Sequence, residues 1–98
     1  MSPSRYIFYP EAVREAQEAR EWYRARSEDA AQGFLSELSE AFQLIAANPD
    51  AWQAHPTGDR RFVMRRYPYL VAYRVFGDRI AVVAVAHQRR KPGYWKGR

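Results

Sequence analysis

The side chains best suited to chemistry follow directly after a long apolar run. Residues 80–86 are all Ile, Val or Ala, and they are followed by His87-Gln88-Arg89-Arg90-Lys91-Pro92-Gly93-Tyr94-Trp95. A histidine can transfer protons at neutral pH because its unperturbed pKa is about 6.5. Arginine offers a planar fork of donors to phosphate or carboxylate. A rigid strand that leads into such a segment is a common way to build a binding or catalytic site.

Charge is distributed unevenly along the chain. Residues 1–59 hold five Arg and ten Asp or Glu, whereas residues 60–98 hold nine Arg and two Lys against Asp78 alone, so the net charges are −5 and +10. Such a positive half favours nucleic acid or an acidic protein as partner. The absence of Cys excludes disulfides, thiol catalysis and thiolate metal sites. The two histidines, His55 and His87, show no metal-ligand spacing, so we expect neither a metal nor another cofactor.

The length of the chain corresponds to one domain spanning residues 1–98. Its first residues contain no apolar signal core, and no apolar stretch approaches the length of a transmembrane helix. The sequence therefore predicts a soluble cytoplasmic protein without a membrane partner.

Two helices are predicted upstream of the candidate site. Residues 6–9 have the aromatic and β-branched composition of a short strand, and Pro10 suits the first turn of a helix that runs to about Arg26. Ser27 can cap a second helix, which Asn48-Pro49 ends. The core face of this second helix is Phe34, Leu35, Leu38, Phe42 and Ile45.

The rest of the chain is predicted to form a loop and three strands. Residues 51–59 form the loop, and the strands are expected at residues 61–66, 69–76 and 79–86. Gly77-Asp78 suits a tight hairpin turn between the last two strands. The last strand is apolar at nearly every position, so it should be central and covered on both faces.

This β-α-α-β-β-β order predicts an α+β fold, in which an N-terminal strand and a helical hairpin precede a three-stranded antiparallel meander. The helices should pack on one face of the sheet, and the Arg excess should show on the opposite face. Gly33 is expected to allow close contact between the two helices. Trp22 and Trp52 are expected to be packing residues.

The ordered set of segments resembles the RelE/ParE superfamily of bacterial toxins, the toxin halves of type II toxin–antitoxin modules. The resemblance covers essentially the whole domain. It is carried by residues 30–38 and Asn48-Pro49, by Phe62-Val63-Met64-Arg65-Arg66-Tyr67 and Tyr73-Arg74-Val75, and by residues 80–87 with Arg90 just beyond.

The resemblance implies one of two activities. RelE-like toxins cut mRNA on the ribosome and typically use Lys and Arg on the exposed sheet face, with an aromatic residue near the C-terminus. ParE-like toxins share the fold and poison DNA gyrase. No Lys lies between Met1 and Arg90, which favours the ParE-like branch. That branch implies DNA gyrase as the target and a cognate antitoxin as partner in a hetero-oligomer, and an acidic antitoxin would suit the basic half of the chain.

The RelE-like alternative needs a base, an acid and a cation around one phosphate. On that alternative His87 transfers protons, Arg65 holds the phosphate, and Tyr94 stacks on a base or donates a proton. His87 could instead only bind neighbouring backbone. The candidate binding residues are Arg74, Arg89, Arg90 and Trp95.

Two further alternatives stay open from the sequence. The chain could be a homologue without toxicity that only binds the antitoxin. Trp95, which follows Pro92-Gly93, either folds back over the core or anchors a partner.

Overall fold

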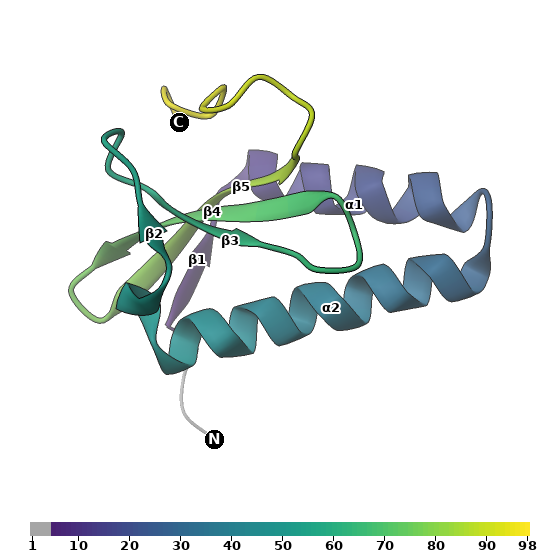
Figure 1. Cartoon of the computed structure of the whole chain (residues 1–98), viewed down its shortest axis with the longest axis horizontal. Helices are drawn as coiled ribbons and strands as arrows, with labels where there is room; N and C mark the ends of the chain where they lie inside the picture. Colours follow the sequence, from purple (N-terminus) through teal and green to yellow (C-terminus); the bar gives the residue numbers. More distant parts are fainter. Residues whose placement is uncertain (1–4) are drawn as a thin grey trace.

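The computed structural model describes residues 5–98, which form one five-stranded sheet with two helices on one of its faces (Figure 1). The strand order is β1-β5-β4-β3-β2, with β1 parallel to β5 and all other pairs antiparallel. The elements are β1 (Tyr6–Phe8), α1 (Pro10–Arg24), α2 (Glu28–Ala47), the short 3-10 helix η1 (Pro49–Ala51), β2 (Gln53–Ala54), β3 (Arg60–Val63), β4 (Tyr69–Phe76) and β5 (Arg79–His87). The predicted α+β fold is confirmed.

The helices begin and end at the residues that the sequence marks. Pro10 occupies the first turn of α1, where its missing N–H costs nothing. The Ser27 hydroxyl accepts the Ala30 N–H at 3.2 Å, which confirms it as the cap of α2. Helix α2 ends before Pro49.

The main core lies between this helical hairpin and the sheet. Its fully buried members from the helices include Phe34 and Ile45, and those from the strands include Val71, Tyr73 and Val82. The Tyr73 hydroxyl donates to the Pro49 carbonyl at 2.6 Å, so this tyrosine is a core residue that also anchors η1, just after α2. No helix within residues 5–98 is long and apolar enough to cross a membrane.

Strand β5 is covered on both faces, as predicted, but β4 and not β5 is the middle strand of the five. Strand β5 lies between β1 and β4, and residues 80–86 are all buried. The turn that leads into it has Gly77 at φ +60°, a left-handed conformation that suits the first position of a two-residue hairpin turn.

Strand boundaries differ from the prediction by more than one residue at two places. Strand β3 ends at Val63 instead of residue 66 because the Glu37 carboxylate of α2 binds the Arg65 and Arg66 amides, which then do not join a ladder. The predicted loop at residues 51–59 contains β2, whose Gln53 pairs with Arg61. A two-residue exposed strand has no hydrophobic pattern that a sequence could show.

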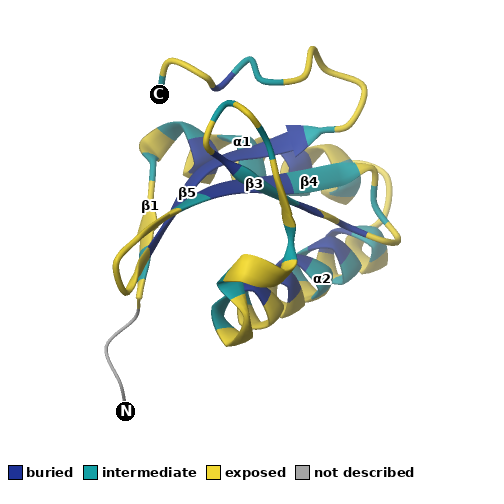
Figure 2. Ribbon diagram, turned by 60° about the vertical axis from the view of Figure 1, so that its left-hand side comes forward, coloured by how far each residue is buried: buried dark blue, intermediate teal, exposed yellow. Residues whose placement is uncertain are grey.

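Two further expectations are wrong. Gly33 does not serve contact between the helices, because a Cβ on it would overlap the hydroxyl of Tyr67 in the loop after β3. The sheet face away from the helices does not present an Arg-rich centre. Its centre holds small residues, Ala72, Ala84 and Ala86, and the C-terminal segment runs over it on the side away from α2 (Figures 1 and 2).

Candidate functional site

The last six residues form a compact segment, the C-terminal strap (residues 93–98), that lies on this second sheet face. Gly93 has a φ of +77°, which turns the chain back after Pro92. The Lys96 N–H donates to the Gly93 carbonyl and the Arg98 N–H to the Trp95 carbonyl, both at 2.9 Å. The Trp95 side chain is only 1% exposed and packs on the small residues of the sheet face. Trp95 therefore folds back over the core.

Glu15 of α1 binds the strap from one side. Its carboxylate accepts hydrogen bonds from the two terminal guanidinium nitrogens of Arg98, with Nη1–Oε1 at 2.9 Å and Nη2–Oε2 at 3.1 Å. It also accepts the Val85 N–H at 3.1 Å and the Tyr94 hydroxyl. Burial and the hydrogen bond to Glu15 raise the pKa of Tyr94 well above its ordinary value, so the hydroxyl keeps its proton.

Two arginines, Arg61 and Arg74, contact the strap from the other side, and Asp59 holds Arg61 in place. Asp59 is fully buried, accepts the Thr57 hydroxyl, and pairs with Arg61 Nε at 3.0 Å. Burial acts to raise the pKa of Asp59, but the hydrogen bonds from Thr57 and Arg61 outweigh it and lower the pKa. The Arg61 guanidinium lies 4.9 Å from the centre of the Trp95 ring, and Arg74 Nη1 donates to the Arg98 carbonyl at 3.1 Å.

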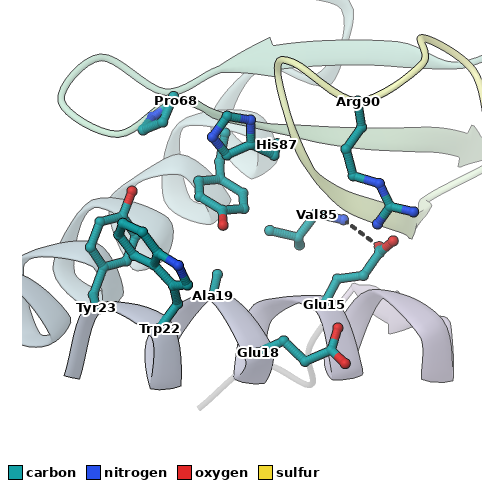
Figure 3. Close-up of a pocket in the computed structure, with 10 residues that line it drawn as sticks. Glu15, Glu18, Ala19, Trp22, Tyr23, Pro68, Val85, His87 and Arg90 are labelled. Atoms are coloured by element: carbon teal, nitrogen blue, oxygen red, sulfur yellow. Dashed lines mark hydrogen bonds between the residues drawn. The ribbon is translucent and has the colours of Figure 1, made fainter. Parts of the chain in front are cut away.

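A pocket of about 380 Å³ lies on the helix side of the sheet, where β5 ends over α1 (Figure 3). One part of it is aromatic and the other part is charged. The aromatic lining is Trp22, Tyr23, Tyr69 and His87, and the charged lining is Glu15, Glu18 and Arg90. A cavity that combines rings with a few charged groups is the usual form of a binding site.

Hydrogen bonding fixes the tautomer of His87 in this pocket. The Nδ1 atom of its ring accepts the Arg89 N–H at 3.1 Å, so the proton of the neutral ring lies on Nε2. The ring packs against Tyr69, with 5.1 Å between the centroids. His87 thus offers one free donor, Nε2–H, in addition to its contact with backbone.

The structure brings some of the predicted site residues together and leaves others apart. His87 and Arg90 line the same pocket, and the Arg90 guanidinium lies 4.2 Å from the centre of the Tyr94 ring. Arg65 follows β3 with an exposed side chain, and within residues 5–98 no hydrogen bond, ion pair or ring contact joins it to His87 or Tyr94. The functional roles of these residues stay predictions.

Arg74 and Arg89 have different surroundings. Arg74 is half-buried beside the strap, whereas the Arg89 side chain is exposed in the turn after β5. Only Arg89 of these two therefore presents its guanidinium freely to a partner.

Sequence reasoning missed two acidic residues near the strap: Glu15, which binds it directly, and Asp59, which pairs with the arginine beside Trp95. Glu15 looks like any acid in the first half of a helix, and Asp59 looks like a loop residue, so no spacing marks either one. Trp22 was expected to pack but is 52% exposed, with the Arg26 guanidinium 3.5 Å from its ring centre. Trp52 does pack, against Phe62, with 4.5 Å between ring centroids.

A second hollow, the apolar groove, lies between β1, α1 and α2. It has a volume of about 390 Å³. Exposed apolar side chains flank it, including Phe8 at 43% and Val13 at 41% exposure. The lining is Phe8, Ala12, Val13, Ala16, Leu35, Leu38 and Phe42, with Gln17, Arg20 and Val85 at its margins. Exposed apolar side chains gathered around a hollow are a common feature of protein-binding sites.

Comparisons with known proteins agree with this geometry. A family model described as "ParE toxin of type II toxin-antitoxin system, parDE" matches residues 6–92. A solved structure titled "Chromosomal ParDE TA system from P. aeruginosa" superposes with a TM-score of 0.69 at 19% identity, over 84% of this chain and 92% of that chain. At that identity the superposition shows a shared fold. A search of curated proteins gives no match.

Proposed function

The chain belongs to the ParE toxin family of type II toxin–antitoxin systems, and on this premise we propose that it inhibits DNA gyrase and is neutralised by a cognate antitoxin. The observation that carries the choice of target is the position of the strap. The sheet face on which a RelE-like toxin would present its cations to RNA is covered here by the chain's own Trp95.

The arrangement of the candidate catalytic residues also favours gyrase over RNA cleavage. A ribonuclease needs its base, acid and phosphate-binding cation around one phosphate. His87 faces α1, the Tyr94 hydroxyl is held by Glu15, and Arg65 contacts neither of them. These three residues therefore offer no common phosphate site.

We propose the apolar groove as the docking site of the antitoxin. An apolar segment of the antitoxin would cover Phe8, Val13 and Phe42, whose burial on binding would supply the hydrophobic part of the affinity. Acidic residues elsewhere in the antitoxin would complement the basic half of the chain and speed the encounter.

Two assays on the purified protein separate the candidate targets. The first measures gyrase-driven supercoiling and the amount of cleaved DNA trapped with gyrase, and the second maps mRNA ends after translation in vitro. We expect loss of supercoiling with intact mRNA. Normal supercoiling together with new cuts inside codons would overturn the proposal in favour of the ribonuclease.

The variant His87→Ala sharpens this choice. A ribonuclease that depends on His87 for proton transfer should lose nearly all turnover, on the order of 10²-fold or more. A gyrase inhibitor that uses His87 only as one contact should lose far less potency, and the matched variant His55→Ala should lose none.

A further inference from the structure

We propose that Glu15 is a positioning residue for the surface that engages the target. It holds the C-terminal strap through Arg98 and Tyr94, and the held strap fixes Arg90 beside His87. This inference rests on the proposed toxin function, because it assigns the residue on which the geometry of the target-binding surface depends.

The first step of the argument concerns the outer edge of β5. Strand β1 pairs with β5 only as far as Val82, whose carbonyl accepts the Tyr9 N–H at 3.0 Å. Beyond that point the chain turns into α1 and leaves the edge of β5 without a neighbouring strand. Buried backbone groups without partners are costly.

Glu15 and Arg98 take the place of the missing strand. Glu15 Oε1 accepts the Val85 N–H at 3.1 Å, and Arg98 Nη1 donates to the Val83 carbonyl at 3.1 Å. The two side chains are only 10% and 18% exposed and pair with each other. One carboxylate therefore joins α1, β5 and the C-terminal residues.

The second step connects this carboxylate to Arg90. The Tyr94 hydroxyl donates to Glu15 Oε2, which fixes the direction of the Tyr94 ring. The Arg90 guanidinium lies over that ring at 4.2 Å from its centre, a cation–π contact. Figure 3 shows Arg90 above Glu15, at the charged side of the pocket that also holds His87.

The third step concerns what the strap would do without Glu15. Among the described residues, its remaining polar contacts to the body of the protein are the bonds from Arg74 to the Arg98 carbonyl and from Arg98 to the Val83 carbonyl, and the packing of Arg61 on Trp95. None of these contacts involves the Tyr94 hydroxyl, and the Tyr94 ring keeps only its packing with Trp95 and with two guanidinium groups. We therefore expect that loss of the Glu15 charge makes the Tyr94 ring and Arg90 mobile while the domain as a whole stays folded.

The test uses Glu15→Gln, which keeps the size of the side chain and one carbonyl acceptor for Val85. The amide group then replaces Oε2, so the Tyr94 hydroxyl and Arg98 Nη2 lose their acceptor and the ionic pair with Arg98 is lost, while the bond from Arg98 Nη1 to Oε1 stays. The matched control is Glu21→Gln on the same helix, since the Glu21 side chain is exposed and, within residues 5–98, forms ion pairs with Arg20 and Arg24 alone. Hydrogen exchange at the amides of Tyr94, Lys96 and Arg98 measures how often the strap opens. We expect this exchange to accelerate by at least tenfold in Glu15→Gln but not in Glu21→Gln.

The activity arm has two readouts. Growth arrest on expression in a bacterial host, at matched protein levels, reports toxicity whatever the target, and inhibition of supercoiling reports gyrase. We expect Glu15→Gln to lose about tenfold in potency. If Glu15 acts through Arg90, then Arg90→Ala should reduce potency in the native chain but add almost nothing in Glu15→Gln, which is the non-additivity of a coupled pair.

A second variant keeps the proposal testable if Glu15→Gln folds poorly. Tyr94→Ala removes the ring under Arg90 and leaves the Glu15–Arg98 pair, so it should match Arg90→Ala in potency and be non-additive with it. Additive losses, or full potency of Glu15→Gln with a loosened strap, would overturn the positioning role. A native chain that arrests growth without affecting gyrase would refute the proposed target only. A native chain that does neither would refute the toxin function and the positioning role with it.

Discussion

Arg98 closes its guanidinium fork on the carboxylate of Glu15, which lies 83 residues earlier in the chain, through bonds of 2.9 and 3.1 Å. The pair joins the C-terminal residues to the first helix and forms hydrogen bonds with the edge of β5, at the Val83 carbonyl and the Val85 N–H. The strap is thus part of the folded domain, and its contacts can be tested one at a time.

The first prediction concerns the stability that this pair supplies. Arg98→Ala leaves the Glu15 carboxylate, which is only 10% exposed, without its cation and the Val83 carbonyl without a donor. We expect a loss of about 2 kcal/mol in the free energy of unfolding, measured by urea titration. The neighbouring exposed variant Lys96→Ala should change it by less than about 0.5 kcal/mol. Equal effects of the two variants would contradict the structure of the strap.

The second prediction concerns Trp95. Its ring is 1% exposed and fills space above Ala72, Ala84 and Ala86, none of which can expand into a cavity. Trp95→Ala should therefore lower the free energy of unfolding by about 3–5 kcal/mol. Trp22→Ala, which removes a ring that is 52% exposed, should cost much less. A small loss for Trp95→Ala would show that the strap is not seated in solution.

The third prediction concerns the acid limit of stability. The pKa of Asp59 is lower in the folded protein than its ordinary value of 3.8, so ionised Asp59 stabilises the fold above about pH 4, and this stabilisation is lost as the pH falls below that value. Asp59→Asn should cost about 2 kcal/mol at pH 7 by removing the charged partner of Arg61. The difference in the free energy of unfolding between the native chain and Asp59→Asn, measured by urea titration, should decrease from pH 5 to pH 2. A difference that stays constant over this range would show that the Asp59 charge does not stabilise the fold.

The fourth prediction concerns the close approach at Gly33. Ala is favoured over Gly by about 1 kcal/mol inside a helix, but a Cβ at Gly33 would overlap the Tyr67 hydroxyl, which donates to the Ala30 carbonyl at 2.8 Å. The Tyr67 ring cannot move away freely, because it packs against Tyr23 and Phe34. Gly33→Ala should therefore lower the free energy of unfolding, or raise it less, in the native chain than in a Tyr67→Phe background, where the hydroxyl is absent. Thermal unfolding of the four proteins in this cycle measures the difference, and strictly additive changes would refute the contact.

The fifth prediction tests the apolar groove as the antitoxin site. Val13 is 41% exposed and lines the groove, so Val13→Glu should place a charge where the antitoxin buries apolar surface. We expect binding of the co-expressed antitoxin to weaken by at least about 10²-fold, a loss of roughly 3 kcal/mol, while growth arrest by the variant persists. Val63→Glu, on the exposed end of β3, is the matched control and should bind normally. Equal binding of the two variants would place the antitoxin elsewhere.

Much of the fold could be predicted from the sequence because it is written in local patterns. The apolar run at residues 80–86 predicts a strand that is buried on both faces, Gly77 predicts the turn before it, and Ser27 predicts the start of α2; the structure confirms all three. Each of these signals depends on a few neighbouring residues. The family resemblance depends on the order of the same segments.

Features that depend on contact between distant segments could not be predicted in this way. Strand β2 exists only because Gln53 meets Arg61, and β3 is short only because Glu37 of α2 binds the amides after it. The neighbour of Gly33 proved to be Tyr67, a residue of a loop and not of the other helix. Propensity and periodicity contain no information on which remote residue comes to lie beside a given side chain.

The sequence by itself determined the α+β architecture, the uneven charge and the placement of His87 and Arg90 at the end of the long apolar strand. The tertiary structure alone decided that Trp95 is buried and that Glu15 holds the strap. The physical reason lies in the edge of β5, whose backbone groups at Val83 and Val85 lose their partner strand when β1 ends. Only the folded sheet creates that need for hydrogen bonds, and residues from the two ends of the chain meet there to satisfy it.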